Sequence, residues 1–301
     1  MGLGILAMST AAIFIRYAQT EAGSLVIAAY RLGIASLILV PIAIIRYRKE
    51  ISSLSKKELL LGLLSGIFLA IHFAAWISSL EYTSVASSLV LVWTSPLWVA
   101  ILAPITIKEP ITKTVGIGML ISFMGTMFIG LSDVCLLAGK LSCPPISDFI
   151  SGKAFIGDML ALVGAWMGAG YLLIGRNLRA KLSLISYISV VYGMAAIILI
   201  LLAFGTNQHF TGYSSKTYLL FLILALVPQL FGHTTVNWAL EYLSAAYVSI
   251  ILLCEPIGSI ILAYLFLNEI PTPIKLFGAI LIFGGVITAS YDRPGSKLAQ
   301  T

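Results

Sequence analysis

Apolar residues fill ten long runs along the chain, and short polar segments separate them. Each run is about 18–24 residues long, the length a helix needs to cross roughly 30 Å of hydrocarbon. The runs lack the alternation of strands, and backbone groups in lipid must bond within their own segment, so the pattern predicts helices. These predicted spans lie near residues 2–19, 24–45, 58–80, 84–106, 113–131, 156–175, 184–205, 217–240, 244–267 and 273–291.

The composition places these helices in a membrane. Hydrophobic residues make up 59% of the chain, charged residues make up 10%, and the mean hydropathy is +1.04. A soluble domain carries about 25% charged residues. We therefore expect an all-α integral membrane protein with ten transmembrane helices and lipids as its surroundings. The net charge of +6 is interpreted as a topology signal, so no nucleic-acid partner is expected.

Basic residues are distributed unevenly between the two sets of loops. With a cytoplasmic N-terminus, the inside segments hold twelve Lys and Arg residues and the outside segments hold five. The positive-inside rule then predicts that both termini are cytoplasmic, with 292–301 as a cytoplasmic tail. The long segment 132–155 becomes an external loop. Cys135 and Cys143 both fall in it, where a disulfide and two free thiols are both compatible with the sequence.

The second half of the chain repeats the first at a constant shift of 160 residues, without a gap. Matches among Leu and Ile carry little weight in so apolar a chain, whereas matches of Pro, Glu and Tyr do. These informative pairs are Glu81-Tyr82 with Glu241-Tyr242, Pro96 with Pro256, and Glu109 with Glu269. Five helices per half is an odd number, so the halves have opposite orientations. The sequence predicts two inverted five-helix repeats, 1–131 and 156–291, an arrangement typical of transporters.

Polar residues within the predicted spans are candidates for chemistry because they are costly in hydrocarbon. Arg31, in the second span, is either an anion site or a structural partner for Glu255 or backbone carbonyls. Glu255, in the middle of the ninth span, either takes and releases protons or forms a permanent ion pair or a cap. Its counterpart in the first half is Ser95, so substrate or ion specificity is expected at this asymmetric position.

Two prolines and two histidines recur between the halves. Pro96 and Pro256 each remove a backbone hydrogen bond, and the freed carbonyls either face a cavity or only mark a packing bend. His72 and His233 are one residue out of register at the shift of 160. They are either protonatable cavity walls or hydrogen-bonded interior histidines. No metal site or cofactor is expected, because the HExxH spacing and cysteine clusters are absent.

Ten spans in two halves, a Tyr-Arg pair in the second span and glycine-rich fifth and tenth spans resemble the drug/metabolite transporter superfamily, and most closely its EamA-type branch. The most specific stretches are Glu81-Tyr82-Thr-Ser-Val-Ala86 followed by Pro96 and Glu109, and Glu241-Tyr242-Leu-Ser-Ala-Ala246 followed by Glu255-Pro256 and Glu269. The resemblance covers essentially the whole chain.

The resemblance implies which residues face a central cavity. The expected substrate-cavity residues are His72, Trp76, Trp93, Trp166, Tyr171, Asn237 and Tyr247. Glu255 and His233 are expected to serve proton coupling. Arg31, Pro96 and Pro256 are expected to be gating or structural residues.

The resemblance also implies a function. We expect a secondary transporter of an amino acid or a related amphipathic solute, acting as an exporter by alternating access in the plasma membrane of a prokaryote. Proton coupling is a hypothesis that rests on Glu255 and the histidines. The alternatives are a channel and an intramembrane enzyme, but the chain lacks Gly-x-Ser-x-Gly and paired intramembrane Asp residues, so we expect no enzyme. Monomer and homodimer both remain open.

Overall fold

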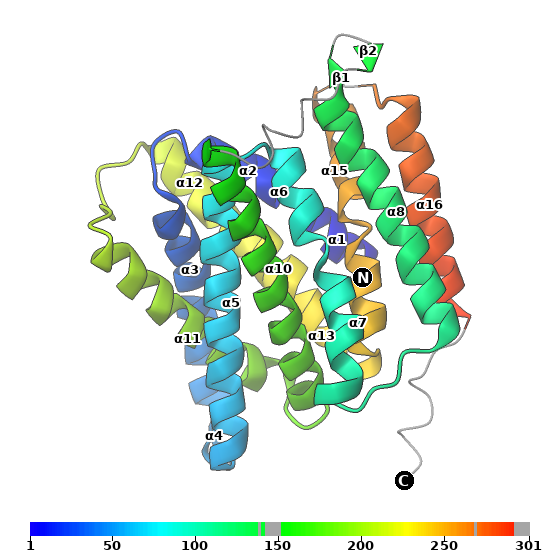
Figure 1. Ribbon diagram of the computed structural model, residues 1–301. Helices are drawn as coiled ribbons and strands as arrows, with labels where there is room; N and C mark the ends of the chain where they lie inside the picture. The colour runs from blue at the N-terminus through cyan, green and yellow to red at the C-terminus, as the bar shows by residue number, and fades with distance from the viewer. Residues whose placement is uncertain (138–139, 142–151, 268–269, 292–301) are drawn as a thin grey trace.

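The computed structural model describes residues 1–137, 140–141, 152–267 and 270–291 (Figure 1). The regular elements of this part of the chain are helices, apart from the two-residue strands β1 (Leu136–Leu137) and β2 (Lys140–Leu141), which pair antiparallel. Within it, nine helices are long and apolar enough to cross a membrane, and Gly2–Ala18 is a shorter apolar helical segment. The fold is an all-α membrane fold of ten transmembrane helices.

The first five spans contain helices that are continuous or broken once. They are α1 (Gly2–Ser9) with α2 (Ala11–Ala18), α3 (Ser24–Arg46), α5 (Lys56–Tyr82), α6 (Val85–Val92) with α7 (Ser95–Thr106), and α8 (Lys113–Cys135). The short α4 (Arg48–Ser52) follows α3.

The second five spans repeat this order with one further irregularity, a π-helix. They are α10 (Gly152–Arg179), α11 (Leu184–Gly205), α12 (Ser215–Leu224) with π-helix η1 (Ala225–His233) and α13 (Thr234–Tyr242), α14 (Ala245–Leu252) with α15 (Glu255–Leu267), and α16 (Pro273–Ser290).

All ten predicted spans coincide with helices. α8 and α10 extend beyond their predicted ends into the segment expected to be an external loop, as far as Cys135 and from Gly152. Residues 142–151, which include Cys143, lie outside the described part of the chain. Residues 292–301 also lie outside it. The predictions about a disulfide and a cytoplasmic tail therefore concern residues that the structure does not describe.

Helices α8 and α16 show how the two halves are related. A Cβ atom on Gly118 would lie 2.4 Å from the carbonyl oxygen of Gly285, and one on Gly125 would lie 2.5 Å from that of Gly278. Gly118 and Gly125 are the repeat counterparts of Gly278 and Gly285, so each glycine packs against the counterpart of the other. Such reciprocal contacts are those of a pseudo-twofold axis between antiparallel helices. These glycines therefore serve a contact within one chain.

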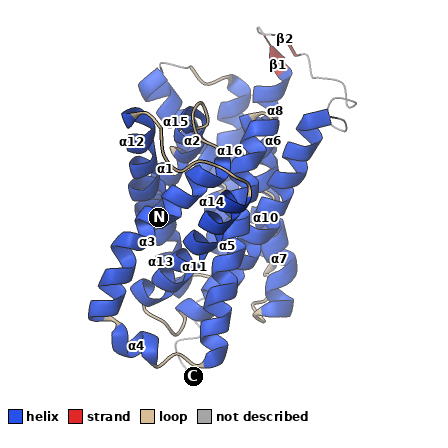
Figure 2. Ribbon diagram, turned by 90° about the vertical axis from the view of Figure 1, so that its left-hand side faces the viewer, coloured by secondary structure: helices blue, strands red, loops and turns tan. Residues whose placement is uncertain are grey.

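The inversion is also visible in where equivalent helices begin. Helix α5 begins beside α4 at the lower end of Figure 1, whereas α12, its counterpart after the shift of 160, begins at the upper end. Figure 2 shows α4 and the β1–β2 hairpin at opposite ends of the molecule. Lys56 and Lys216, which are repeat counterparts, thus lie at opposite ends.

Carboxylates bind the beginnings of helices at both ends. Glu50 accepts hydrogen bonds from the Ser183 backbone N–H (2.6 Å) and hydroxyl (2.7 Å) at the start of α11. Burial raises the pKa of Glu50, but these hydrogen bonds outweigh it and leave the pKa below its ordinary value. At the opposite end, Glu21 accepts from the Ser214 backbone N–H and hydroxyl at the start of α12, and these bonds lower the pKa of Glu21.

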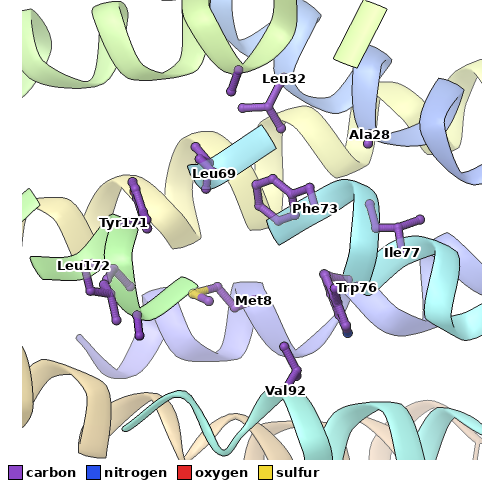
Figure 3. Close-up of a cluster of buried hydrophobic side chains, with 14 of the residues drawn as sticks. Met8, Ala28, Leu32, Leu69, Phe73, Trp76, Ile77, Val92, Tyr171 and Leu172 are labelled. Carbon is purple, nitrogen blue, oxygen red and sulfur yellow. The ribbon is translucent and has the colours of Figure 1, made fainter. Parts of the chain in front are cut away.

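The core fills the space where α1, α3, α5, α6 and α10 meet. Figure 3 shows Met8, Phe73, Trp76, Val92 and Leu172 in one cluster, contributed by four of these helices. All five side chains are buried. This apolar packing encloses the polar groups described next.

Candidate functional site

A small cavity of about 90 Å³ lies at the centre of the helix bundle. Its walls come from both repeats. The lining residues on which the argument rests are Arg31, His72, Trp76, Trp93, Tyr171, His233 and Glu255. Met8, Val92 and Leu172 supply apolar wall. About 90 Å³ is well below the roughly 300–1,000 Å³ of pockets for drug-sized ligands, so this conformation suits only a compact solute.

Two helix breaks border the cavity at equivalent positions. α6 ends at Val92 and α7 begins at Ser95, while α14 ends at Leu252 and α15 begins at Glu255. A proline occupies the second position of each new helix, where its missing N–H needs no partner. Pro96 and Pro256 therefore start helices within the fourth and ninth spans instead of merely bending them. Pro96 lines the cavity, whereas Pro256 does not.

The π-helix η1 explains the one-residue offset between the histidines. A π-helix has wider turns than an α-helix, so each residue rotates less about the axis. His233 is the last of the nine residues of η1. His233 therefore faces the cavity as His72 does from the regular helix α5.

The two histidines have different surroundings. His72 Nδ1 lies 2.7 Å from the carbonyl oxygen of Gly164. Because a carbonyl only accepts, this nitrogen carries the proton. The His72 ring stacks on Trp76 with a centroid distance of 6.1 Å. His233 is buried with its ring edge-on to Phe73, and its Nδ1 has no hydrogen-bond partner among the described residues.

Arg31 is buried in the middle of α3, with 1% of its surface exposed. Its Nε donates a hydrogen bond of 2.8 Å to Gln229 Oε1 on η1, and its guanidinium lies 4.2 Å from the centroid of the Phe73 ring. Gln229 is fully buried and was not among the predicted site residues. A polar residue beside Pro228 in the eighth span was a sequence signal that could have identified it.

Glu255 is the first residue of α15 and lines the cavity. Its backbone carbonyl accepts a hydrogen bond of 2.8 Å from the Ser9 hydroxyl of the first helix pair. The Trp93 indole lies within reach of the carboxylate without a hydrogen bond of ordinary geometry. Within the described residues, the Glu255 carboxylate makes no ion pair.

Three predicted cavity residues lie elsewhere. Trp166 is 42% exposed and packs edge-on against Trp98. It lies two positions before the lining residue Gly168, so its side chain points roughly 200° around the helix from the cavity face. Tyr247 lies two positions from the lining residue Ser249 in the same way, and its hydroxyl meets Ser290 on α16 at 2.5 Å.

Asn237 supports the cavity wall from behind instead of facing it. Its side chain is fully buried, accepts a hydrogen bond of 2.8 Å from the Tyr171 hydroxyl and donates one of 3.2 Å to the Tyr192 hydroxyl. Its amide also donates to the His233 carbonyl at 2.9 Å. The amide thus holds Tyr171 in the cavity wall.

A polar network joins the two repeats at the end predicted to be cytoplasmic. Glu109, after α7, accepts a hydrogen bond of 2.6 Å from Arg176 Nε on α10 and one of 3.1 Å from the Ala245 backbone N–H at the start of α14. Arg176 also donates to the carbonyls of Leu240 (2.8 Å) and Glu241 (3.1 Å). The side chains of Glu109 and Arg176 are 14% and 10% exposed, so this contact is largely shielded from water.

The opposite end carries an equivalent arginine contact. Arg16, the repeat counterpart of Arg176, donates to the carbonyl of Leu80, the counterpart of Leu240. Glu269, the counterpart of Glu109, lies outside the described residues. Among those that are described, no group of three or more His, Cys, Asp or Glu side chains could hold a metal ion.

Comparisons with known proteins identify a family, two relatives named as transporters and a solved structure of the same fold. The sequence pattern of the EamA-like transporter family matches residues 1–131 and 155–291. The Uncharacterized transporter YyaM of Bacillus subtilis is 26% identical, over 87% of this chain and 83% of its own length. An Uncharacterized transporter of Archaeoglobus fulgidus is 23% identical, over 95% and 94%. A protein of known crystal structure shares the fold with a TM-score of 0.76 at 15% identity, over 98% of this chain and 96% of its own.

Proposed function

Because the chain belongs to the EamA-like transporter family and is a multi-pass membrane transporter, we propose that it is a secondary transporter that moves a small amphipathic metabolite by alternating access. The cavity carries this proposal. It lies between the breaks of two inverted repeats, where related architectures place a substrate site near the bilayer midplane. Helix ends at membrane depth are tolerated where they line such a cavity.

The solute that suits these walls is compact and has both a polar and an apolar part. Two indoles, Val92 and Leu172 provide apolar surface in the cavity. Arg31 and Glu255 provide its charged groups. An amino acid or a related metabolite has this character. We place the protein in the plasma membrane of a prokaryote, with both termini cytoplasmic and with export as its direction. Relatives in a bacterium and an archaeon support the location.

Alternation requires contacts that form at one end and break when that end opens. The Glu109 contact with Arg176 and the Ala245 N–H has this character, because it joins the first repeat to the second. We propose that this contact holds that end closed. The inverted repeat provides an equivalent set of positions at the other end, where we propose that a second closed state forms.

Glu255 and His233 are the groups that we propose for proton coupling. Both residues line the cavity. A carboxylate at membrane depth without an ion-pair partner destabilises the fold, and a role in transport would explain why the chain has one. Replacing Glu255 with Gln keeps the shape and removes the titrating group. We expect this variant to bind solute but to lose the pH dependence of transport. An unchanged pH profile would refute the coupling role.

The test of the main proposal is counterflow in proteoliposomes. The purified chain is reconstituted with an unlabelled amino acid inside, and uptake of the same labelled compound is followed over a panel of amino acids. A carrier gives a transient, saturable accumulation that depends on the internal solute. Flux that rises linearly with concentration and shows no counterflow would mean a channel instead. When the Glu255→Gln variant is assayed, Lys216→Gln, at an exposed position, is the control for the loss of one charged side chain.

A further inference from the structure

Buried polar atoms without a hydrogen-bond partner gather around the cavity. Nine buried side-chain polar atoms lack a partner among the described residues, and four of these belong to cavity-lining residues: Arg31, Trp76, Trp93 and His233. A fifth, Gln229 Nε2, belongs to the residue bonded to Arg31. Four of the five atoms can only donate: Arg31 Nη1, the two indole nitrogens and Gln229 Nε2. This concentration indicates a ligand rich in acceptors.

An unmade hydrogen bond at a buried donor costs about 1–3 kcal/mol, and native structures contain few of them. The cost is greatest at Arg31, because its charge is buried. Within the described residues no carboxylate lies at ion-pair distance from it. Glu255 lines the same cavity as Arg31. A buried cation without a counter-ion is expensive unless a ligand completes it.

Gln229 orients this cation. A guanidinium can only donate, so the Gln229 oxygen must face Arg31 Nε, and the amide nitrogen is left as a further donor. The Phe73 ring fixes the guanidinium plane from one side, at 4.2 Å. Arg31 Nη1 and Gln229 Nε2 are thus two unpaired donors on residues joined by one hydrogen bond. Of these two residues only Arg31 lines the cavity, so its guanidinium is the group that can meet a carboxylate there.

We infer that Arg31, positioned by Gln229, is the residue that binds a carboxylate group of the transported solute. This assigns Arg31 a binding role in place of the gating or structural role expected from the sequence. The inference rests on the proposed function, in that the cavity is the solute site. A second negative charge on the solute is disfavoured by Glu255, and the apolar walls at Val92 and Leu172 accept a short hydrocarbon part. The solute class is a compact amphipathic monocarboxylate, with or without an amine that meets Glu255.

Binding to matched probes tests the inference. The purified full chain in detergent is titrated with propionate, propionamide, propylammonium and alanine, and both the melting temperature and tryptophan fluorescence are followed. We expect propionate, alanine or both to raise the melting temperature by mass action, and the amide and the amine to bind at least tenfold more weakly. Tighter binding of alanine than of propionate would assign an amine subsite at Glu255. Equal binding of the amide and the carboxylates, or no carboxylate binding, overturns the inference.

Variants separate binding from folding. Arg31→Lys keeps the charge but loses the planar donor fork, so we expect carboxylate affinity to fall at least tenfold. Gln229→Glu is nearly isosteric, keeps the acceptor for Arg31 Nε, neutralises the guanidinium and removes the free donor. We expect it to melt like the parent and to lose carboxylate binding. Arg48→Gln, at an exposed position on α4, is the matched control and should leave the affinity unchanged.

The outcomes distinguish this inference from the proposed function. If both variants bind carboxylates like the parent, Arg31 is not the binding residue, whether or not the protein transports. If binding depends on Arg31 but counterflow fails for every solute that binds, the inference stands and the transport proposal fails. Counterflow of alanine that is unaffected by Arg31→Lys would sink the inference alone.

Discussion

Replacing Glu109 with Gln tests whether one carboxylate holds an end of the molecule closed. Glu109 accepts two hydrogen bonds from the second repeat, one from the Arg176 guanidinium (2.6 Å) and one from the Ala245 backbone N–H (3.1 Å). A hydrogen bond to a charged group contributes about 1.5–3 kcal/mol. The Gln oxygen can still accept one bond, so we expect the closed state to lose about that amount. The equilibrium should then shift toward the open state by roughly ten- to hundredfold.

Maleimide labelling of a cysteine at position 249 reports this shift. Ser249 is fully buried and lines the cavity from α14, four residues after Ala245, where the helix begins. In a background with the native cysteines replaced by Ser, the Glu109→Gln variant should label roughly tenfold faster or more. Glu58→Gln is the matched control, because Glu58 pairs with Lys181 at 3.7 Å on an exposed surface and such pairs contribute little.

Equal labelling rates in these two variants would refute the reasoning. Both melting temperatures are measured as well, so that faster labelling through unfolding is recognised. The gating effect requires faster labelling of a protein that remains folded at the labelling temperature.

Three further outcomes are expected. Gly118→Ala should destabilise the fold by about 1–3 kcal/mol, because the new Cβ would lie 2.4 Å from a backbone carbonyl of α16, whereas Gly284→Ala, with nothing within 4 Å, should leave the melting temperature unchanged. Glu50→Gln should lower the free energy of unfolding by about 1 kcal/mol at pH 7. Because folding lowers the pKa of Glu50, this contribution is present above the unfolded pKa of about 4.3 and is lost as the pH falls through the folded pKa. Parent and variant should therefore melt alike in stronger acid. Cysteines at Lys56 and Lys216 should react with an impermeant maleimide from opposite sides of the membrane, and reaction of both from one side would disprove the inverted arrangement.

The sequence was sufficient to predict the fold. Runs of apolar residues determine where helices can lie in a membrane, because length and hydropathy alone decide whether a segment crosses. All ten predicted spans are helices. The shift of 160 residues also predicted that equivalent positions lie at opposite ends, as Lys56 and Lys216 do.

The candidate site was only partly predictable. His72, Trp76, Trp93 and Glu255 line the cavity, but Trp166 and Tyr247 do not, although they lie in the right spans. Depth along a helix can be counted from the sequence, whereas the direction in which a side chain points depends on the rotation of each helix. A residue two positions away from a cavity-lining residue in the same helix points roughly 200° away from the cavity.

What the sequence by itself determined is the set of helices, their length and the inversion of the two halves. These follow from the apolar length of each segment and from an odd number of spans, both of which are properties of the chain. Only the tertiary structure decided that Arg31 meets Gln229, 198 residues away, and that a π-helix turns His233 toward the cavity. Contacts of this kind depend on how helices rotate and pack against one another, and no local pattern in a single segment encodes that packing.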